Sequence, residues 1–512
     1  MTKKNVLGLK SFLIAIVLLV PLIIGISWGV VIAASDSEPE FDDFSELSGK
    51  KIAMLTGAPF EELISSKVPN VGEFQYFANM PDMELALKSK KIDAYLINNA
   101  IAELKANVDE ELAIFNEPLA DSEFGFAFKK GSKERDKWQE AYDNLDDKLI
   151  DELWDKWTGS DYSAKTIPEQ DWPGKNGTVK VATCDTLEPM CYLGDDGQLV
   201  GFDIEVMLLI AKELDVHVEF IGMEFAAIMP YVQSGKADVA CGSIIVTDER
   251  KESMDFVNYH YAAFVLVVRA LNSGSEKLSF WDGIKSSFNK TFIRGKRYKL
   301  ILEGLGRTLI IAVMSGALGT LLGFLLVFAR RRNNRVVNRL IAIYKGLITG
   351  VPVVVILMLL YYVLFGKTDI SAVIVAIIGF TIIFGSRAFG LIWNAVENVD
   401  KGQREAALAL GYSESKAFRR VVLPQARGIY FPVLKTQLVM LLKETSIAGF
   451  ITVVDLTRAG DLIRSRTMEA FFPLIAIAII YFLLTFILAK ILGLVDKRFV
   501  KKRKNVRIKG VD

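Results

Sequence analysis

Long apolar runs and charged stretches alternate along this chain. Residues 12–34 and much of 300–495 are strongly apolar, whereas 36–178 mixes charged and apolar positions as water-soluble domains do. A helix needs about 20 apolar residues to cross a bilayer. The pattern therefore predicts membrane spans joined to a soluble module.

Five spans are predicted in the C-terminal part of the chain, at 303–329, 349–366, 371–395, 429–450 and 470–495. Basic clusters follow the first and the last span, at 330–339 and 497–504. Because positive charge marks the cytoplasmic side, five spans that start outside and end inside give a consistent topology. A third basic cluster would lie outside, which a short interfacial helix would explain: Lys290, Arg294, Lys296, Arg297 and Lys299.

The N-terminal apolar run allows two interpretations. Phe12–Ala34 is 23 residues long, whereas the apolar core of a secretory signal has about 7–15 residues. A retained membrane anchor at 1–35 is therefore favoured, and cleavage after Val31-Ile32-Ala33 is the alternative. In both cases the segment that follows is exported.

Strand-like and helix-like segments alternate between the two apolar parts. Strands are predicted at Lys51–Leu55, Ile92–Ile97, Val179–Thr183, Val216–Phe220 and Ala237–Cys241, and helical patterns at Glu134–Trp157, Asp203–Leu214 and Ala226–Ser234. The polar segment Ser160–Gly177 divides them. Such alternation predicts an α/β fold with a largely parallel sheet, in two units at 46–160 and 177–272.

Composition excludes several kinds of chemistry. Two histidines and three cysteines without metal-site spacing predict no metal centre, and no Ser/His/Asp constellation indicates an enzyme. Because G-x-x-x-x-G-K-[ST] is absent, the chain is expected neither to hydrolyse ATP nor to hold another cofactor. No nucleic-acid partner is predicted at a net charge of +1. Free core thiols are favoured for Cys184 and Cys191, with a disulfide as the alternative.

The segment 401–426 lies between two predicted spans, on the basic side of the membrane. Gln403–Leu410 is predicted to form a short helix with small residues on one face, which Gly411 ends in a left-handed conformation. Ser413 then caps a second helix that ends before Pro424. This helix–glycine–helix elbow indicates a docking surface for a cytoplasmic partner, although its spacing alone fits a plain connector equally well.

These residues resemble the loop by which permeases of ABC importers fit into a cleft of their ATPase subunit. The matching residues are Glu405, Ala406, Ala407, Gly411, Leu423 and Pro424. Further matches to the polar amino-acid permeases are Thr308-Leu309, Gly350-Val351-Pro352 and Lys443-Glu444-Thr445-Ser446. The resemblance covers about 300–495. It implies a permease domain at 300–498, a separate ATPase subunit that uses ATP, and a second permease copy, with a homodimer favoured.

Residues 177–272 resemble the first lobe of the two-lobed periplasmic amino-acid binding proteins. The matching residues include Pro189-Met190, Gly201-Phe202-Asp203, Gly235-Lys236-Ala237-Asp238 and Thr247-Asp248-Glu249-Arg250. Residues 46–160 resemble the second lobe with its returning helix, through Leu47-Ser48-Gly49-Lys50 and Gly125–Gly131. The lobes thus occur in reversed order, like a circular permutation opened at the hinge; two half-domains left from a tandem pair are the alternative. In the permuted form, lobe closure would pull on two membrane attachments.

The resemblance also implies ligand contacts. Arg250 aligns with the arginine that grips the substrate carboxylate, and a planar guanidinium suits bidentate pairing. Phe225 aligns with an aromatic residue that packs on the ligand, and Thr56-Gly57 would present backbone N–H groups. A surface ion pair is the alternative for Arg250, and a core position is the alternative for Phe225.

Three positions depart from the family pattern. Asn98 lies where the family has an aspartate for the α-ammonium group, Ile245 replaces a carboxylate-binding threonine, and Leu187 replaces an aromatic residue. Losing a charge-assisted partner costs about 1.5–3 kcal/mol. Glu188 and Asp185 are candidates to replace it. The amino-acid assignment therefore depends more on the permease part than on the pocket.

Arg387 interrupts the third predicted span. An ionisable residue at such depth usually faces a bundle interior, where it could guide a substrate carboxylate along the translocation pathway. A structural pair with Glu444 and snorkelling near the span end are the alternatives. The family's own charged positions here align with Gly390 and Trp393, so gating details are not transferred.

The sequence as a whole predicts a multidomain protein of the cell membrane. An α/β two-lobed extracellular domain would join an all-α five-helix transmembrane bundle, with an N-terminal anchor in the lipid bilayer. Its predicted function is uptake of a small polar solute, with an amino acid favoured. A ligand-gated channel or sensor with a glutamate-receptor-like clamp is the alternative, but no segment between the spans resembles the re-entrant loop that such channels need.

Overall fold

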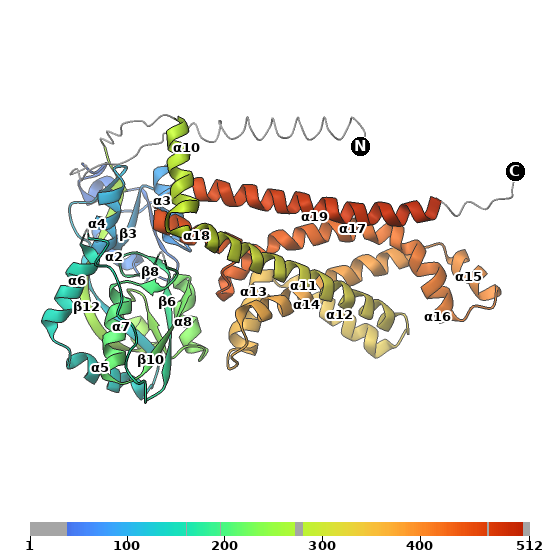
Figure 1. The fold of residues 1–512 in the computed structure, drawn as a ribbon, viewed down its shortest axis with the longest axis horizontal. Helices are drawn as coiled ribbons and strands as arrows, with labels where there is room; N and C mark the ends of the chain where they lie inside the picture. Colours follow the sequence, from blue (N-terminus) through green and yellow to red (C-terminus); the bar gives the residue numbers. More distant parts are fainter. Residues whose placement is uncertain (1–37, 160, 195, 272–279, 468–470, 505–512) are drawn as a thin grey trace.

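The structure is a computed structural model that describes residues 38–159, 161–194, 196–271, 280–467 and 471–504. The predicted anchor Phe12–Ala34 lies outside these residues. Figure 1 shows an α/β part at one end and long helices that extend from it. This combination of an α/β domain with an all-α bundle is the one that the hydrophobic pattern predicts.

One mixed sheet runs through the α/β part in the order β10-β6-β11-β5-β12-β3-β1-β2, with β4 paired to β12. Its strands are β1 (Lys51–Leu55), β2 (Glu73–Phe77), β3 (Ala94–Asn98), β4 (Leu112–Ile114), β5 (Ala120–Lys129), β6 (Thr178–Cys184), β10 (His217–Met223), β11 (Val239–Cys241) and β12 (Met254–Arg269). A small second sheet joins β7 (Thr186–Leu187), β8 (Cys191–Leu193) and β9 (Leu199–Val200). Pairing is parallel among β1, β2 and β3 and among β6, β10 and β11, as expected, but antiparallel wherever β5 or β12 takes part.

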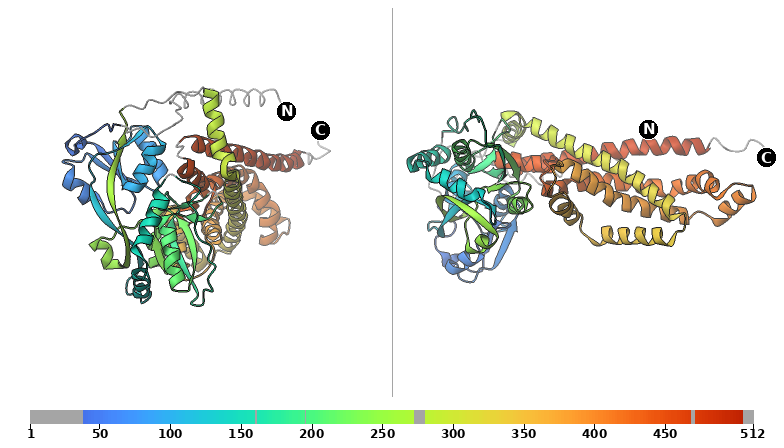
Figure 2. Two further views of the ribbon diagram at one scale, coloured as in Figure 1. Left: turned by 60° about the vertical axis from the view of Figure 1, so that its left-hand side comes forward. Right: turned by 90° about the horizontal axis from the view of Figure 1, so that it is seen from below.

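Strands β5 and β12 form a hinge between two lobes. They pair with each other and shift register between Asn258 and His260. The end of β5 pairs with β11 at Ala127 and Phe128, whereas the end of β12 pairs with β3 at Phe264–Val268. Each strand therefore leaves one half of the sheet and enters the other. We call the half with β1–β4 lobe two, the half with β6–β11 lobe one, and both together the clamp (Figure 2).

Helices cover both lobes. Those beside β1–β4 are η1 (Phe44–Leu47), α2 (Glu61–Lys67), α3 (Met80–Lys88) and α4 (Asn99–Val108), and those beside β6–β11 are α5 (Glu134–Asp143), α6 (Asp147–Thr158), α7 (Phe202–Glu213), α8 (Phe225–Gln233) and α9 (Asp248–Ser253). The single helical pattern expected at Glu134–Trp157 is two helices, because Asn144 ends α5 and the Asp146 side chain caps α6. Lys156 and Trp157 of α6 both bond to Glu205 of α7, which fixes this pair on lobe one.

The second part of the chain consists of helices. They are α10 (Phe280–Phe288), η2 (Asn289–Ile293), η3 (Arg294–Lys296), α11 (Tyr298–Arg330), α12 (Arg335–Gly350), α13 (Val353–Met358), η4 (Leu359–Leu364), α14 (Ala372–Glu397), α15 (Lys401–Ala409), α16 (Glu414–Ala417), η5 (Phe418–Val422), α17 (Leu423–Glu444), η6 (Thr445–Ile451), α18 (Leu456–Thr467) and α19 (Phe472–Lys504). Three of those described, α11, α14 and α19, are long and apolar enough to span a membrane alone. Two bent pairs raise the number to five if each pair is one span.

The second predicted span, 349–366, differs most from the structure. A bend of 111° separates α12 from the helix at Val353–Leu364. Pro352 stands at this break, where it cannot donate a backbone hydrogen bond to the preceding turn. Only the first two residues of the predicted span belong to α12, and most of the others form the helix Val353–Leu364. Helix α12 begins at Arg335, among the residues assigned to a cytoplasmic basic cluster.

Glycines allow α11 and α14 to pack closely. A Cβ atom on Gly319 would lie 2.9 Å from the Phe384 side chain, and one on Gly323 would lie 2.8 Å from Cβ of Ala388. Membrane helices associate through such small residues because lipid supplies no hydrophobic drive between them. The pair α11–α14 therefore forms the centre of the bundle.

Candidate functional site: the cleft of the clamp and its seat on the membrane helices

A cavity lies between the two lobes. Its lining is mostly apolar and comes from Leu55, Ala58, Phe60, Leu96, Ile97, Asn98, Ile101, Leu187, Phe225, Ser243, Ile245, Arg250 and Phe264. The predicted residues Phe225, Asn98, Ile245 and Arg250 are thus brought together. The cavity measures about 30 Å³, which holds about one water molecule. The lobes are closed, and a ligand as large as an amino acid can enter only after they open.

Arg250 connects the two lobes across this cavity. The hydroxyl of Thr247 accepts a bond from its backbone N–H and caps α9, so the arginine sits in the first turn of that helix. Its guanidinium donates to the carbonyl oxygens of Ile245 and of Gly57, each at 2.8 Å. Within the described residues it forms no ion pair, so the surface-pair alternative is not what the structure has. A cation held only by carbonyl groups can still accept an anionic partner.

Burial changes the ionisation of Arg250 only moderately. Desolvation lowers the pKa of its guanidinium to about 10, and the nearby Glu249 acts in the opposite direction. The side chain therefore keeps its positive charge at neutral pH. Among the described residues that line this mostly apolar cavity, no carboxylate meets this positive charge. The cavity therefore favours a ligand that brings its own carboxylate.

Of the two predicted backbone donors, Thr56 is already used. The backbone N–H of Thr56 donates to the carbonyl of Phe77 at 2.8 Å, and its hydroxyl donates to the same oxygen. This N–H continues the pairing of β1 with β2 and is not available to a ligand. Gly57 contributes its carbonyl oxygen to Arg250, so lobe two supplies an acceptor here, and a ligand contact of the Gly57 N–H stays a prediction.

Asn98 occupies the cavity wall at the start of α4. Its Oδ1 atom accepts the backbone N–H of Ile101 at 2.9 Å and so caps that helix. An aspartate could make the same cap, because both residues suit this position. The change from aspartate to asparagine therefore alters the charge of the cavity without altering its backbone.

The two candidate replacements for a lost carboxylate lie elsewhere. Asp185 is an ion-pair partner of Arg458 in α18, so it does not supply the missing charge in the cavity. Glu188 is buried but is not among the residues that line the cavity. The closed cavity thus contains one cation and no carboxylate.

Ser243 is a cavity residue that the sequence did not reveal. Its backbone N–H donates to Oδ2 of Asp203 at 2.6 Å, and Asp203 is fully buried behind the cavity wall. Desolvation raises the pKa of Asp203 to about 7, although its bonds from Tyr259 and Ser243 oppose this. Asp203 therefore positions the segment that carries Ser243 and Ile245.

Helix α18 of the membrane part holds both lobes of the clamp. Arg458 pairs with Asp185 and with Glu224, the latter at 2.5 Å, and both belong to lobe one. Arg464 pairs with Asp82 of lobe two at 2.7 Å. Both arginines are almost completely buried, with side chains 5% and 2% exposed. One short helix therefore carries the charges that bind the two halves of the closed clamp.

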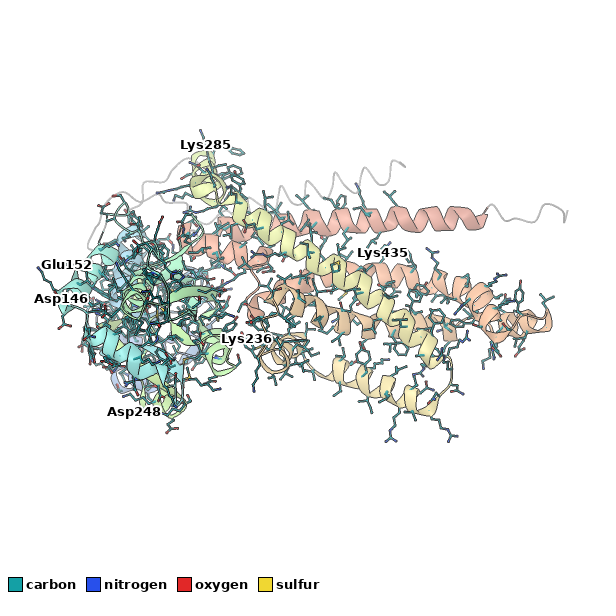
Figure 3. All side chains as sticks on the ribbon, turned by 60° about the horizontal axis from the view of Figure 1, so that its bottom comes forward. Asp146, Glu152, Lys236, Asp248, Lys285 and Lys435 are labelled. Atoms are coloured by element: carbon teal, nitrogen blue, oxygen red, sulfur yellow. The ribbon has the colours of Figure 1, made fainter. Side chains whose placement is uncertain are left out.

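Lobe one has a second contact with the membrane helices, beside the turn that follows η4. Lys180 pairs with Asp369 at 2.7 Å, and Lys236 donates to the carbonyl of Phe365 at 2.9 Å. The hydroxyl groups of Tyr231 and Tyr361 lie 3.2 Å apart. Figure 3 shows Lys236 where the clamp meets the long helices. The clamp therefore stands directly on the outer end of the bundle.

The elbow between α14 and α17 lies at the opposite end of the bundle (Figure 1). Gly411 has a φ of +80°, as expected for a left-handed stop, and Arg404 pairs with Glu414 across it at 2.5 Å. Glu405 and Ala406 are exposed, whereas Ala407 is buried. Leu410 is 80% exposed at the end of the first elbow helix. The sequence analysis did not single it out.

The second helix of the elbow does not end before Pro424. It continues from α16 through the π-turn η5 into α17, with Pro424 in the first turn of α17. A proline is tolerated there because the π-turn before it interrupts the regular hydrogen-bond ladder, to which proline cannot donate. Leu423 and Pro424 therefore open the next long helix, and the predicted stop is wrong.

Comparisons with known proteins identify the family. Residues 179–444 match the bacterial extracellular solute-binding proteins, family 3. The probable amino-acid ABC transporter permease YckA of Bacillus subtilis is 31% identical over 203 residues, which are 40% of this chain and 90% of the relative. The glutamine transport system permease GlnP of Escherichia coli is 33% identical over 202 residues, 39% of this chain and 92% of the relative. The chain belongs to the amino-acid ABC transporter permeases.

Solved structures are similar to parts of this permease. A crystal structure described as an amino acid ABC transporter with histidines is 29% identical, with a TM-score of 0.38, and the match covers 43% of this chain and 99% of that chain. An ancestral arginine-binding protein bound to arginine is 45% identical, with a TM-score of 0.15, over 15% of this chain and 34% of that chain.

Arg387 of the permease lies in α14 and pairs with Glu444 at the end of α17. Its NH1 atom lies 2.8 Å and 2.6 Å from the two carboxylate oxygens. This is the structural pair that the sequence analysis kept as an alternative. A contact with a passing substrate would have to compete with this bond, and a role in the pathway stays a prediction.

The cysteines of the permease are free and buried: Cys184, Cys191 and Cys241. Burial raises the pKa of Cys191 and of Cys241 well above the ordinary thiol value. The structure thus has the core thiols that were favoured over a disulfide.

Proposed function

We propose that this permease takes up an amino acid that its own clamp captures, driven by ATP hydrolysis in a separate subunit. Arg250 carries the proposal, because a half-buried cation whose described hydrogen-bond partners are carbonyl oxygens suits the carboxylate of an amino acid. The names of the relatives support the same class of solute, since they describe permeases for glutamine and for L-cystine. Transport is favoured over a ligand-gated channel because these relatives are permeases.

ATP-driven uptake tests this proposal. The full chain, reconstituted in vesicles with the ATPase that copurifies with it, should accumulate a radiolabelled amino acid only when ATP is present on the ATPase side. A panel of the common amino acids would identify the solute. Accumulation that continues without ATP, or ion conductance opened by the solute, would contradict it.

The two lobes form one permuted clamp in this proposal, with boundaries near 46–160 and 177–272. The crossing strands β5 and β12 support it, because each contributes to both halves of one sheet. Two leftover half-domains would have no reason to exchange strands. An anchor at 1–35 would attach lobe two to the membrane. The end of β12 that leads toward α10–α11 also lies in lobe two, because it pairs with β3 and β4 and Ala270 pairs with Pro39. The expectation that the first permease span carries lobe one is therefore wrong.

Asn98→Asp is expected to strengthen the binding of an amino acid by about tenfold. The carboxylate would keep the cap on α4 and add a charged acceptor for the α-ammonium group, and charge-assisted bonds are about twice as strong as neutral ones. Calorimetric titration of the full chain would measure the affinity. Asn99→Asp, one residue further along α4, is the matched control, and an Asn98→Asp affinity equal to wild type would show that the ammonium group binds elsewhere.

The elbow is proposed to fit the ATPase subunit. Glu405, Ala406, Gly411 and the exposed Leu410 would form its contact surface, with Leu423 and Pro424 joining it to α17. Force would then pass from the ATPase through α17 toward Glu444 and α18. Helix α18, at the end of this series, is the helix that contacts the clamp.

Leu410→Ser combined with Glu405→Arg is expected to reduce copurification of the ATPase at least tenfold. The double change removes an apolar anchor and reverses a charge in the proposed contact. Pull-down with the tagged permease measures it. Leu494→Ser is the control, because this residue is 62% exposed in α19 but lies outside the elbow. Equal yields from both variants would exclude the elbow as the docking surface.

A second copy of the chain is proposed to complete the pathway, giving a homodimer in the cell membrane with the clamp outside. One face of α12 supports this, because four apolar residues at helical spacing are between 52% and 67% exposed: Val336, Leu340, Ile343 and Leu347. A bundle of one copy leaves this face uncovered. Crosslinking across Leu340 would test the symmetric contact.

A further inference from the structure

A belt of basic side chains precedes α11. Segment 285–299 has six basic residues and no acidic residue: Lys285, Lys290, Arg294, Lys296, Arg297 and Lys299. It lies at the clamp end of the bundle, opposite to the elbow (Figure 1). The cytoplasmic positive charge of membrane proteins does not account for it.

Helix α10 lies across the direction of the long helices. In Figure 1 it stands upright beside the outer ends of α11 and α19, which run horizontally, and the views in Figure 2 agree. If α11 and α19 cross the bilayer, α10 lies along its outer surface. This orientation matches the interfacial helix that the basic cluster predicts.

The exposed face of α10 combines aromatic and basic groups. Trp281, Lys285 and Phe288 follow each other at intervals of four and three residues, so they share one face. Trp281 is 73% exposed and Phe288 49%, whereas Gly283 and Ser287 are buried on the other side. Figure 3 shows Lys285 at the edge of the molecule, away from the bundle.

Aromatic contacts hold this face at the level of the helix ends. The ring of Phe288 lies 4.9 Å from that of Phe292, and Phe292 lies 6.5 Å from Phe472 at the start of α19. Ile293 continues the apolar surface and is 55% exposed. The exposed cations Arg294, Lys296 and Lys299 follow it directly.

We propose that this belt binds the headgroups of anionic phospholipids in the outer leaflet. Trp281, Phe288 and Ile293 would enter the boundary between headgroups and acyl chains, where amphipathic aromatic residues are enriched. The four exposed cations, Lys285, Arg294, Lys296 and Lys299, would meet the phosphate groups. An aromatic face beside lysines suits the headgroup region of a bilayer. In water the rings would stay exposed, which is unfavourable, and in the hydrocarbon core the charged groups would lose their hydration.

The test uses the full chain in detergent, titrated with fluorescent phosphatidylglycerol and separately with phosphatidylcholine. The quadruple variant Lys285→Gln, Arg294→Gln, Lys296→Gln, Lys299→Gln is expected to bind phosphatidylglycerol more than 100-fold more weakly, since each basic residue near a membrane contributes about fivefold. Binding of phosphatidylcholine should change less than threefold. The double variant Trp281→Ser, Phe288→Ser should bind both lipids more weakly than the wild type.

Four exposed lysines of the clamp provide the matched control, each changed to glutamine: Lys90, Lys133, Lys175 and Lys212. This control should bind phosphatidylglycerol as the wild type does. An equal loss in the control and in the belt variant would overturn the proposal, because it would show a general effect of net charge. Full competition by millimolar inorganic phosphate would also overturn it, as the belt would then be a site for free anions.

Discussion

Replacing Arg250 with alanine is expected to weaken the binding of the transported amino acid by about 10- to 150-fold. A charge-assisted bond to a carboxylate contributes about 1.5–3 kcal/mol, and every 1.4 kcal/mol changes affinity tenfold. The guanidinium is the one cation among the residues that line the described cavity, so no neighbour can take over its role. Calorimetric titration of the full chain in detergent with the amino acid measures the change in affinity.

The same arginine also bonds to Gly57 in lobe two, so its loss could simply loosen the closed clamp. The ligand separates the two effects. Wild type should prefer the amino acid strongly over the amine that lacks the carboxylate, and Arg250→Ala should bind both equally. Arg135→Ala is the matched control, since Arg135 also donates to a backbone carbonyl of lobe one, Phe256 at 2.7 Å, outside the cavity. Full affinity in Arg250→Ala would end the carboxylate model.

The cavity shows how far short motifs determine a site. Arg250 and Asn98 could be placed because they align with ligand-contact positions of the binding-protein family. The structure then shows that the Thr247 cap positions Arg250 in the first turn of α9 and that Asn98 ends the buried strand β3. Ser243 could not, since its role depends on Asp203, 40 residues earlier, and no local pattern reports a bond across that distance.

Helix boundaries in the membrane part were harder to predict where a proline lies within or beside an apolar segment. Hydropathy indicated α11, α14 and α19 because each contains an apolar stretch long enough to cross a bilayer. Hydropathy predicted one span at 349–366, but Pro352 stands between α12 and α13 and starts a new helix there. Pro424 was expected to end a helix, yet the π-turn before it allows the proline to start the next one. A proline thus marks a boundary without showing whether a helix ends or begins there.

The ion pairs of α18 were beyond prediction from sequence. Arg458 and Asp185 are 273 residues apart, and Asp185 looked like a candidate ligand contact. Only the docked clamp shows that this carboxylate faces the membrane helices instead of the ligand. The position of the clamp on the bundle, which no motif encodes, therefore decides the role of the residue.

Arg458→Gln is expected to remove more than nine tenths of amino-acid-stimulated ATP hydrolysis, while the affinity of the clamp for the amino acid changes little. Breaking a buried pair leaves an uncompensated charge and costs about 3–5 kcal/mol. Here Asp185 and Glu224 would both lose their partner, and burial already raises the pKa of Glu224 to about 7. The clamp of the variant would lose its contact with α18. An assay of ATP hydrolysis by the permease together with its ATPase, with and without the amino acid, would measure the effect.

Arg464 tests whether α18 responds to both lobes. Arg464→Gln is expected to lower stimulated hydrolysis by a smaller factor, about three- to tenfold, because its partner Asp82 is 43% exposed and water screens that pair. Exchanging the charges, with Arg464→Asp and Asp82→Arg together, should restore part of the lost activity, whereas each single change should not. Thr457→Val, on the same helix but bonded to Tyr481 of α19 and not to the clamp, is the control. Arg458 pairs with lobe one and Arg464 pairs with lobe two, in addition to Asp461 of its own helix, so only the closed clamp makes both sets of contacts between the lobes and α18. Undiminished stimulation after the loss of either arginine would mean that the membrane helices detect the ligand by another route.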